Sequence, residues 1–153
     1  MGDENIREVH RQLRVSQDKY TYFILAVAGA AVALAIRETH GTAIAWPHLL
    51  VGLAVLCWGL SFFCGCRHIE YVNATLYANG DLLKVQNGIH PEYNTNPQNA
   101  LVAVEAIREA VASNSVKSGN LARWQFKFLI IGALFYIGWH IWGMVLLALV
   151  PTK

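Results

Sequence analysis

Three long stretches of this chain contain no Asp, Glu, Lys or Arg, and they constrain its fold more than any other feature. These charge-free runs cover residues 20–36, 46–66 and 128–150, which is 17, 21 and 23 residues. A helix needs about 20 apolar residues to cross a ~30 Å hydrocarbon layer, so each run is long enough or nearly so. Only 14% of the residues are charged, well below the roughly 25% of soluble domains. The sequence predicts an all-α integral membrane protein with three transmembrane helices.

The basic residues are distributed unevenly around the three runs. Four precede the first run and six lie between the second and third, whereas only Arg37 and Lys153 flank the other ends, giving ten against two. Cytoplasmic segments of membrane proteins retain Lys and Arg. We therefore expect an N-in, C-out protein with three crossings.

The remaining segments complete the predicted organisation. Residues 1–19 carry Ile6, Val9 and Leu13 at helical spacing, which predicts a short amphipathic helix. Residues 20–66 form a transmembrane hairpin with spans at 20–36 and 46–66, and residues 67–121 form a cytoplasmic helical segment. Residues 122–150 form the third transmembrane helix, and 151–153 are an external tail.

The 67–121 segment is predicted to hold a two-helix insert. Apolar residues recur at helical intervals on both sides of a turn-rich stretch at 86–97, where Asn96 is placed to cap a helix beginning at Pro97. Residues 113–120 fit either a second loop or a helix that continues into the third span. About sixty residues build little core alone, so these apolar faces are expected to be buried by each other, by the N-terminal helix or by neighbouring copies of the chain.

The first span carries small residues at the spacing used where helix backbones approach closely in lipid. They form two small-xxx-small pairs, Ala26 with Ala30 and Gly29 with Ala33. One interpretation is a helix interface between copies of the chain. The other is that alanine is simply abundant in a short span.

His140 is the only titratable side chain in the third run. Polar groups at that depth usually face a protein interior or an aqueous cavity. His140 is therefore the candidate for lining a pore or gate, for a hydrogen bond across a subunit interface, or for a place near the outer membrane interface. The structural alternative is a neutral histidine bonded to a neighbouring backbone or indole group.

A basic collar consists of Arg67, Arg123 and Lys127, with Trp124 between the last two. One interpretation is an anchor to anionic lipid headgroups. The other is a positive vestibule in an oligomer, able to hold phosphates or a nucleotide-type ligand.

Two thiols and an imidazole, Cys64, Cys66 and His68, lie within five residues of one another. They are weak metal-ligand candidates, because a structural zinc site needs four ligands and no others can be named. Palmitoylation or plain packing of the thiols are the alternatives. No phosphate-binding loop, nucleophile elbow or dinucleotide fingerprint is present. We expect no cofactor, no metal and no enzymatic activity.

These features together predict a homo-oligomeric membrane channel or pore, gated through its cytoplasmic helices. The layout, from the 20–66 hairpin through the 67–127 segment to the final span, resembles that of small multi-pass membrane effectors of bacterial anti-phage defence systems. The resemblance implies that a partner enzyme or nucleotide signal controls membrane damage. The alternative is a non-conducting scaffold that docks a soluble partner through the helices of residues 69–112.

Overall fold

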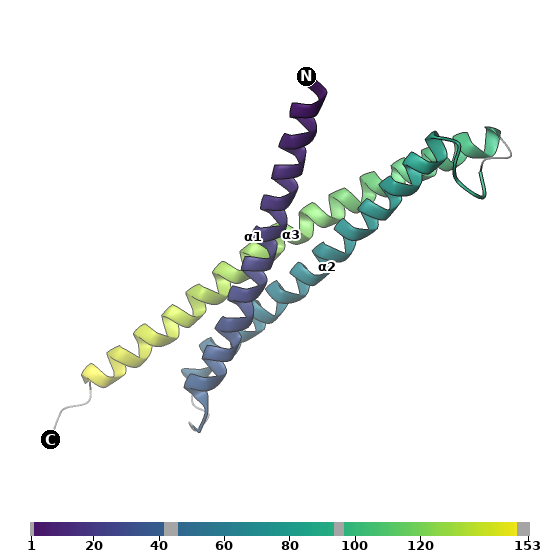
Figure 1. Ribbon diagram of the computed structural model, residues 1–153. Helices are drawn as coiled ribbons and strands as arrows, with labels where there is room; N and C mark the ends of the chain where they lie inside the picture. Colours follow the sequence, from purple (N-terminus) through teal and green to yellow (C-terminus); the bar gives the residue numbers. More distant parts are fainter. Residues whose placement is uncertain (1, 42–45, 94–96, 150–153) are drawn as a thin grey trace. The chain divides into compact units, whose positions relative to one another are not determined.

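The computed structural model describes residues 2–41, 46–93 and 97–149, and in these ranges the chain forms three long α-helices (Figure 1). They are α1 (Gly2–Thr39), α2 (His48–Gln86) and α3 (Pro97–Leu149). Each contains a stretch long and apolar enough to cross a membrane. The predicted all-helical class is therefore confirmed, with three helices that are long and apolar enough to cross a membrane.

The helices are much longer than a membrane requires. They contain 38, 39 and 53 residues, which at 1.5 Å per residue is roughly 57, 59 and 80 Å. α1 begins before the first charge-free run, and α2 continues past the second. α3 passes without a break through residues 113–120, where the sequence left a loop and a helix open. No proline interrupts α3 after Pro97, so its hydrogen-bond ladder has no forced break.

Glycines with positive φ follow the first two helices. Gly41 has φ of 78° and Gly88 has φ of 66°, a conformation that costs glycine little because it has no Cβ. After α2, Ile89 N donates to Lys84 O at 3.0 Å and Gly88 N donates to Val85 O at 3.1 Å, which is a Schellman cap. α3 begins at Pro97. The predicted cap, Asn96, lies outside the described residues.

The chain forms two compact units. Residues 1–65 and 124–153, here called the three-helix unit, hold nearly all of the charge-free runs. The core of this unit is centred on α1 and α2, and residues of α3 pack against it. Its buried members are Ala35, Val51, Ala54 and Trp58, with Ala31, Val32, Val55, Leu129, Phe135, Tyr136 and Trp139 around them.

Residues 66–123, here called the two-helix unit, contain the rest of α2 and the first half of α3. The two helices run antiparallel, because His68 contacts Ser118 and the Tyr71 ring lies 5.7 Å from Lys117 Nζ. Val85 and Ser118 are buried in this unit. Its surface ion pairs lie within single helices, for example Lys84 with Asp81 at 2.8 Å.

Candidate functional site

In the three-helix unit, side-chain donors on α2 bond to main-chain carbonyls on α3. Ser61 Oγ donates to Gln125 O at 2.8 Å, and Trp58 Nε1 donates to Leu129 O at 3.2 Å. Both donor side chains are buried. Lipid offers no hydrogen-bond partner to such groups, so the two contacts fix the register of α2 against α3.

The helices of this unit approach each other closely at Gly65 and Gly132. A Cβ at Gly132 would lie 2.6 Å from Trp58 Nε1 and 3.1 Å from Ala54 O. A Cβ at Gly65 would lie 2.5 Å from Gln125 Nε2 and 2.7 Å from Leu25 Cδ2. At Gly132 the neighbours are an indole that is hydrogen-bonded and a backbone oxygen, so this position requires glycine as the helices are packed. At Gly65 the neighbours are the ends of the Gln125 and Leu25 side chains, which can shift to admit a Cβ.

Sequence reasoning missed these contacts, although the chain contains a signal for them. Small or polar residues recur every seven positions in both helices, as they do along a seam between packed helices. The positions are Ala54, Ser61 and His68 in α2, and Ser118, Gln125 and Gly132 in α3.

Gln125 has one polar atom without a partner. Its side chain is 3% exposed, and Nε2 makes no hydrogen bond among the described residues. An unpaired buried donor costs about 1–3 kcal/mol. The side-chain amide of Gln125 is therefore less well satisfied than the Ser61 hydroxyl, which donates to the main-chain oxygen of Gln125.

The small residues predicted to form an interface on α1 are uncovered in the single chain. Ala26, Gly29, Ala30 and Ala33 are all exposed, and a Cβ at Gly29 would meet nothing within 4 Å. The other side of the helix packs on its neighbours through Thr21, Ile24, Ala28 and Ala35, which are buried. The four exposed small residues, Ala26, Gly29, Ala30 and Ala33, are referred to below as the small-residue face.

His140 is exposed on α3, and its imidazole has no hydrogen-bond partner among the described residues. The preceding residue, Trp139, packs against the core of the three-helix unit. Its ring lies 5.5 Å from that of Tyr136 and 6.5 Å from that of His48 on α2. His140 therefore points away from the core of its own unit. The imidazole lies beside the Trp139 ring, with ring centroids 6.5 Å apart. A polar ring on an apolar helix needs a hydrogen-bond partner, and none of the described residues supplies one.

The three basic collar residues each contact their own helix. Arg67 pairs with Glu70 and lies 5.4 Å from the Tyr71 ring. Arg123 Nη2 donates to Asn120 Oδ1 at 2.6 Å. Lys127 Nζ lies 4.8 Å from the Trp124 ring, a cation–π contact. The structure assigns the first two residues to the two-helix unit and Lys127 to the three-helix unit.

The weak metal-ligand candidates are differently placed. Cys64 is buried, whereas Cys66 and His68 are half-buried. His68 Nδ1 lies 2.8 Å from Ser118 Oγ and 3.0 Å from Ser118 O, so this imidazole joins α2 to α3. Within residues 2–41, 46–93 and 97–149, no group of three His, Cys, Asp or Glu side chains is arranged to hold a metal ion.

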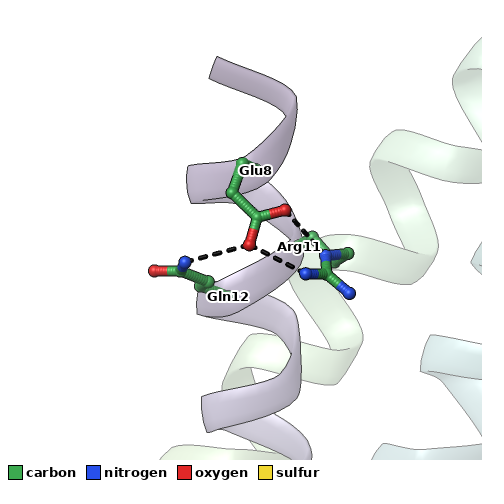
Figure 2. A network of polar contacts seen from close by, with 3 residues as sticks. All are labelled: Glu8, Arg11 and Gln12. Carbon is green, nitrogen blue, oxygen red and sulfur yellow. Dashed lines mark hydrogen bonds and ion pairs between the residues drawn. The ribbon is translucent and has the colours of Figure 1, made fainter. Parts of the chain in front are cut away.

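The first turns of α1 carry a polar network on an exposed surface. Figure 2 shows Glu8 accepting hydrogen bonds from Arg11 at 2.8 and 2.9 Å and from Gln12 at 3.0 Å. The hydrogen bond from Arg11 is the main reason that the pKa of Glu8 falls to about 2, and the bond from Gln12 adds to it. The apolar residues Val9, Leu13 and Val15 of this segment are exposed.

The chain matches no protein-family model, no curated protein and no solved structure. The three apolar helices define its class, which is that of a multi-pass membrane protein.

Proposed function

We propose that the protein is a homo-oligomeric membrane channel or pore, opened and closed through the helical segments that extend beyond its charge-free runs. The observation that carries this proposal is that the small-residue face and His140 are both exposed on the three-helix unit. A single copy leaves a close-packing surface uncovered and an imidazole unpaired. Assembly of several copies would cover the small-residue face and give the His140 imidazole a protein or aqueous environment.

The proposal includes an orientation. The ten-to-two division of Lys and Arg supports a cytoplasmic N-terminus and two-helix unit, with the C-terminus outside. The layout resemblance supports a bacterial inner membrane and a role in anti-phage defence. A cytoplasmic protein or a nucleotide-type ligand is then the stimulus, and the protein itself catalyses no reaction.

Reporter fusions test the orientation. A phosphatase fused after Lys153 should be active, because three crossings from a cytoplasmic N-terminus put the C-terminus outside. A fluorescent protein that folds only in the cytoplasm should be dark at the same position and bright when fused to the N-terminus. Fluorescence at Lys153 would contradict the orientation.

Substitution of Gly29 tests the interface. Gly29→Leu should weaken assembly by at least about tenfold in dissociation constant, because a leucine side chain separates helices that pack through small residues. The measurement is subunit number by native mass spectrometry over a range of protein-to-detergent ratios.

Gly52→Leu is the matched control. Gly52 is also an exposed glycine with nothing within 4 Å, but it lies on α2 beside exposed leucines, Leu49, Leu53 and Leu56. The Gly52→Leu variant should assemble like the wild type. Equal subunit numbers and stabilities for wild type, Gly29→Leu and Gly52→Leu would remove Gly29 from the interface.

A non-conducting scaffold is the second candidate, and exposed apolar side chains of the two-helix unit favour it. Tyr77, Leu83, Leu101 and Val102 are between 59% and 78% exposed. Such a surface suits a soluble protein partner. A scaffold conducts no ions, so measurements of conductance separate the two functions.

A further inference from the structure

The register between α2 and α3 determines the depth of Lys127. Ser61 is level with Gln125 through the 2.8 Å hydrogen bond to its carbonyl, and Ala54 is level with Gly132. Because α2 and α3 run antiparallel, residues at the same level have numbers with a constant sum, which is 186 for both pairs (61 and 125, 54 and 132). The backbone of Lys127 is therefore level with Gly59, since 127 and 59 also add to 186.

Gly59 lies well inside the charge-free run of α2. The run continues from Gly59 for six more residues to Gly65, the end of the three-helix unit, which is about 9 Å of helix. α1 is also apolar at that end, because Leu25 is the residue that approaches Gly65. Lys127 thus carries its charge alongside a part of α2 suited to hydrocarbon.

The charge-free runs of α2 and α3 therefore overlap over only part of their lengths. α2 begins at His48, so in the same register residues 48–58 of α2 lie level with residues 128–138 of α3, which is 11 residues each. Eleven residues of helix span about 17 Å, against a ~30 Å hydrocarbon layer. A bilayer of ordinary thickness cannot surround both helices without enclosing Lys127.

The surroundings of Lys127 show which group can neutralise it. Its side chain is exposed, and Nζ lies over the Trp124 ring at 4.8 Å, so it leans toward the N-terminal end of α3. The structure describes no ion pair to Lys127. The charge-free runs contain no Asp or Glu, so a neighbouring copy offers no carboxylate there either.

We propose that Lys127 and Trp124 bind the phosphate of a phospholipid headgroup, drawn below the membrane surface beside α3. The ammonium pairs with the phosphate, and the half-exposed indole occupies the interfacial region where tryptophan is favoured. The bilayer is thinned at this point. Its hydrocarbon thickness then matches the short stretch over which α2 and α3 are both free of charges. The site does not depend on whether the protein conducts ions.

Native mass spectrometry of the full-length protein with phosphatidylglycerol tests this proposal. Lys127→Gln should lower lipid affinity by about fivefold, the contribution of one basic residue near an anionic surface, whereas Lys127→Arg should retain the lipid. Lys84→Gln, which removes an exposed lysine of the two-helix unit, is the matched control and should bind as the wild type does. Equal loss of lipid in the two glutamine variants, or no loss in either, would overturn the assignment.

Two further measurements identify the source of the phosphate and the depth of the site. Inorganic phosphate at millimolar concentration should leave the lipid bound, and displacement would show that free phosphate is the ligand and overturn the lipid assignment. In phosphatidylcholine vesicles of increasing acyl-chain length, the wild type should incorporate best in thinner bilayers than Lys127→Leu. The same preferred thickness for both, with wild-type helix content in the variant, would contradict the thinning.

Discussion

Replacing Gly132 by alanine should lower the thermal midpoint of the protein, whereas the same replacement at Gly143 should not. The added methyl group at Gly132 would lie 2.6 Å from Trp58 Nε1 and 3.1 Å from the carbonyl oxygen of Ala54. Trp58 cannot move away freely, because its indole donates to Leu129 O. Overpacking of this kind costs about 1–3 kcal/mol, which for a chain of this size corresponds to roughly 2–12 °C.

Gly143 is the matched control on the same helix, since a Cβ there would meet nothing within 4 Å. Gly143→Ala should leave the midpoint unchanged or raise it slightly, because alanine is the better helix former by about 1 kcal/mol. Midpoints should be followed by circular dichroism at one scan rate in one detergent. Equal midpoints for the two alanine variants would show that α3 does not pack against Trp58 as described.

A double mutant tests the cause of the effect. Trp58→Phe removes the indole nitrogen that approaches Gly132, at the cost of the bond to Leu129 O. If that nitrogen is the obstacle, Gly132→Ala should be less damaging in the Trp58→Phe background than in the wild type. Additive losses in the double mutant would place the strain at a ring carbon of residue 58, where Trp58 Cδ1 lies 2.7 Å from the added methyl group, or at the Ala54 carbonyl instead.

Replacing His140 by alanine should change ion flux and its dependence on pH. Imidazole changes charge between about pH 5 and 8, and a unit charge about 4 Å from a passing ion changes its energy by roughly 1 kcal/mol even in water. That corresponds to about a fivefold change in rate. Flux in liposomes should be followed between pH 5.5 and 7.5 for wild type, His140→Ala and His40→Ala.

His40 lies beyond α1 in the turn that follows it, so its replacement is the control for loss of an imidazole outside the charge-free runs. His40→Ala should keep the wild-type pH profile, and His140→Ala should lose it. Identical rates, selectivities and profiles for wild type and His140→Ala would assign His140 a structural role only.

The three spans could be predicted from the sequence because each depends on its own residues alone. A run without charges is sufficient to require an apolar environment, whichever neighbours it has. The continuity of α3 through residues 113–120 was less predictable, since serine and asparagine favour loops when isolated. In the structure, Ser118 is buried and contacts His68, so tertiary packing outweighs local preference there.

The packing of the helices could not be predicted from residue types in the same way. Gly29 and Gly132 are both glycines in apolar spans, yet only Gly132 contacts another helix in the single chain. The hydrogen bonds of Ser61 and Trp58 end on main-chain carbonyls, which every residue possesses, so their partners leave no signature in the sequence. The seven-residue spacing of small and polar residues is the available signal, and it requires both helices to be read together.

The depth of Lys127 follows from the same register. In the sequence alone Lys127 borders a charge-free run and is indistinguishable from Arg67 at the end of another. Only the alignment of α2 with α3 shows that Lys127 is level with Gly59. Lys127, a member of the basic collar predicted from the sequence, is therefore level with an apolar part of α2.

Conductance of the purified protein in planar lipid bilayers tests the central proposal most directly. The wild type, shown by native mass spectrometry to be assembled, should produce discrete current steps of uniform size. Gly29→Leu, present at the same amount but dissociated, should produce none. Assembled wild-type protein that gives no current above that of protein-free bilayers, at acidic and neutral pH alike, would contradict the channel and leave the scaffold as the function of the chain.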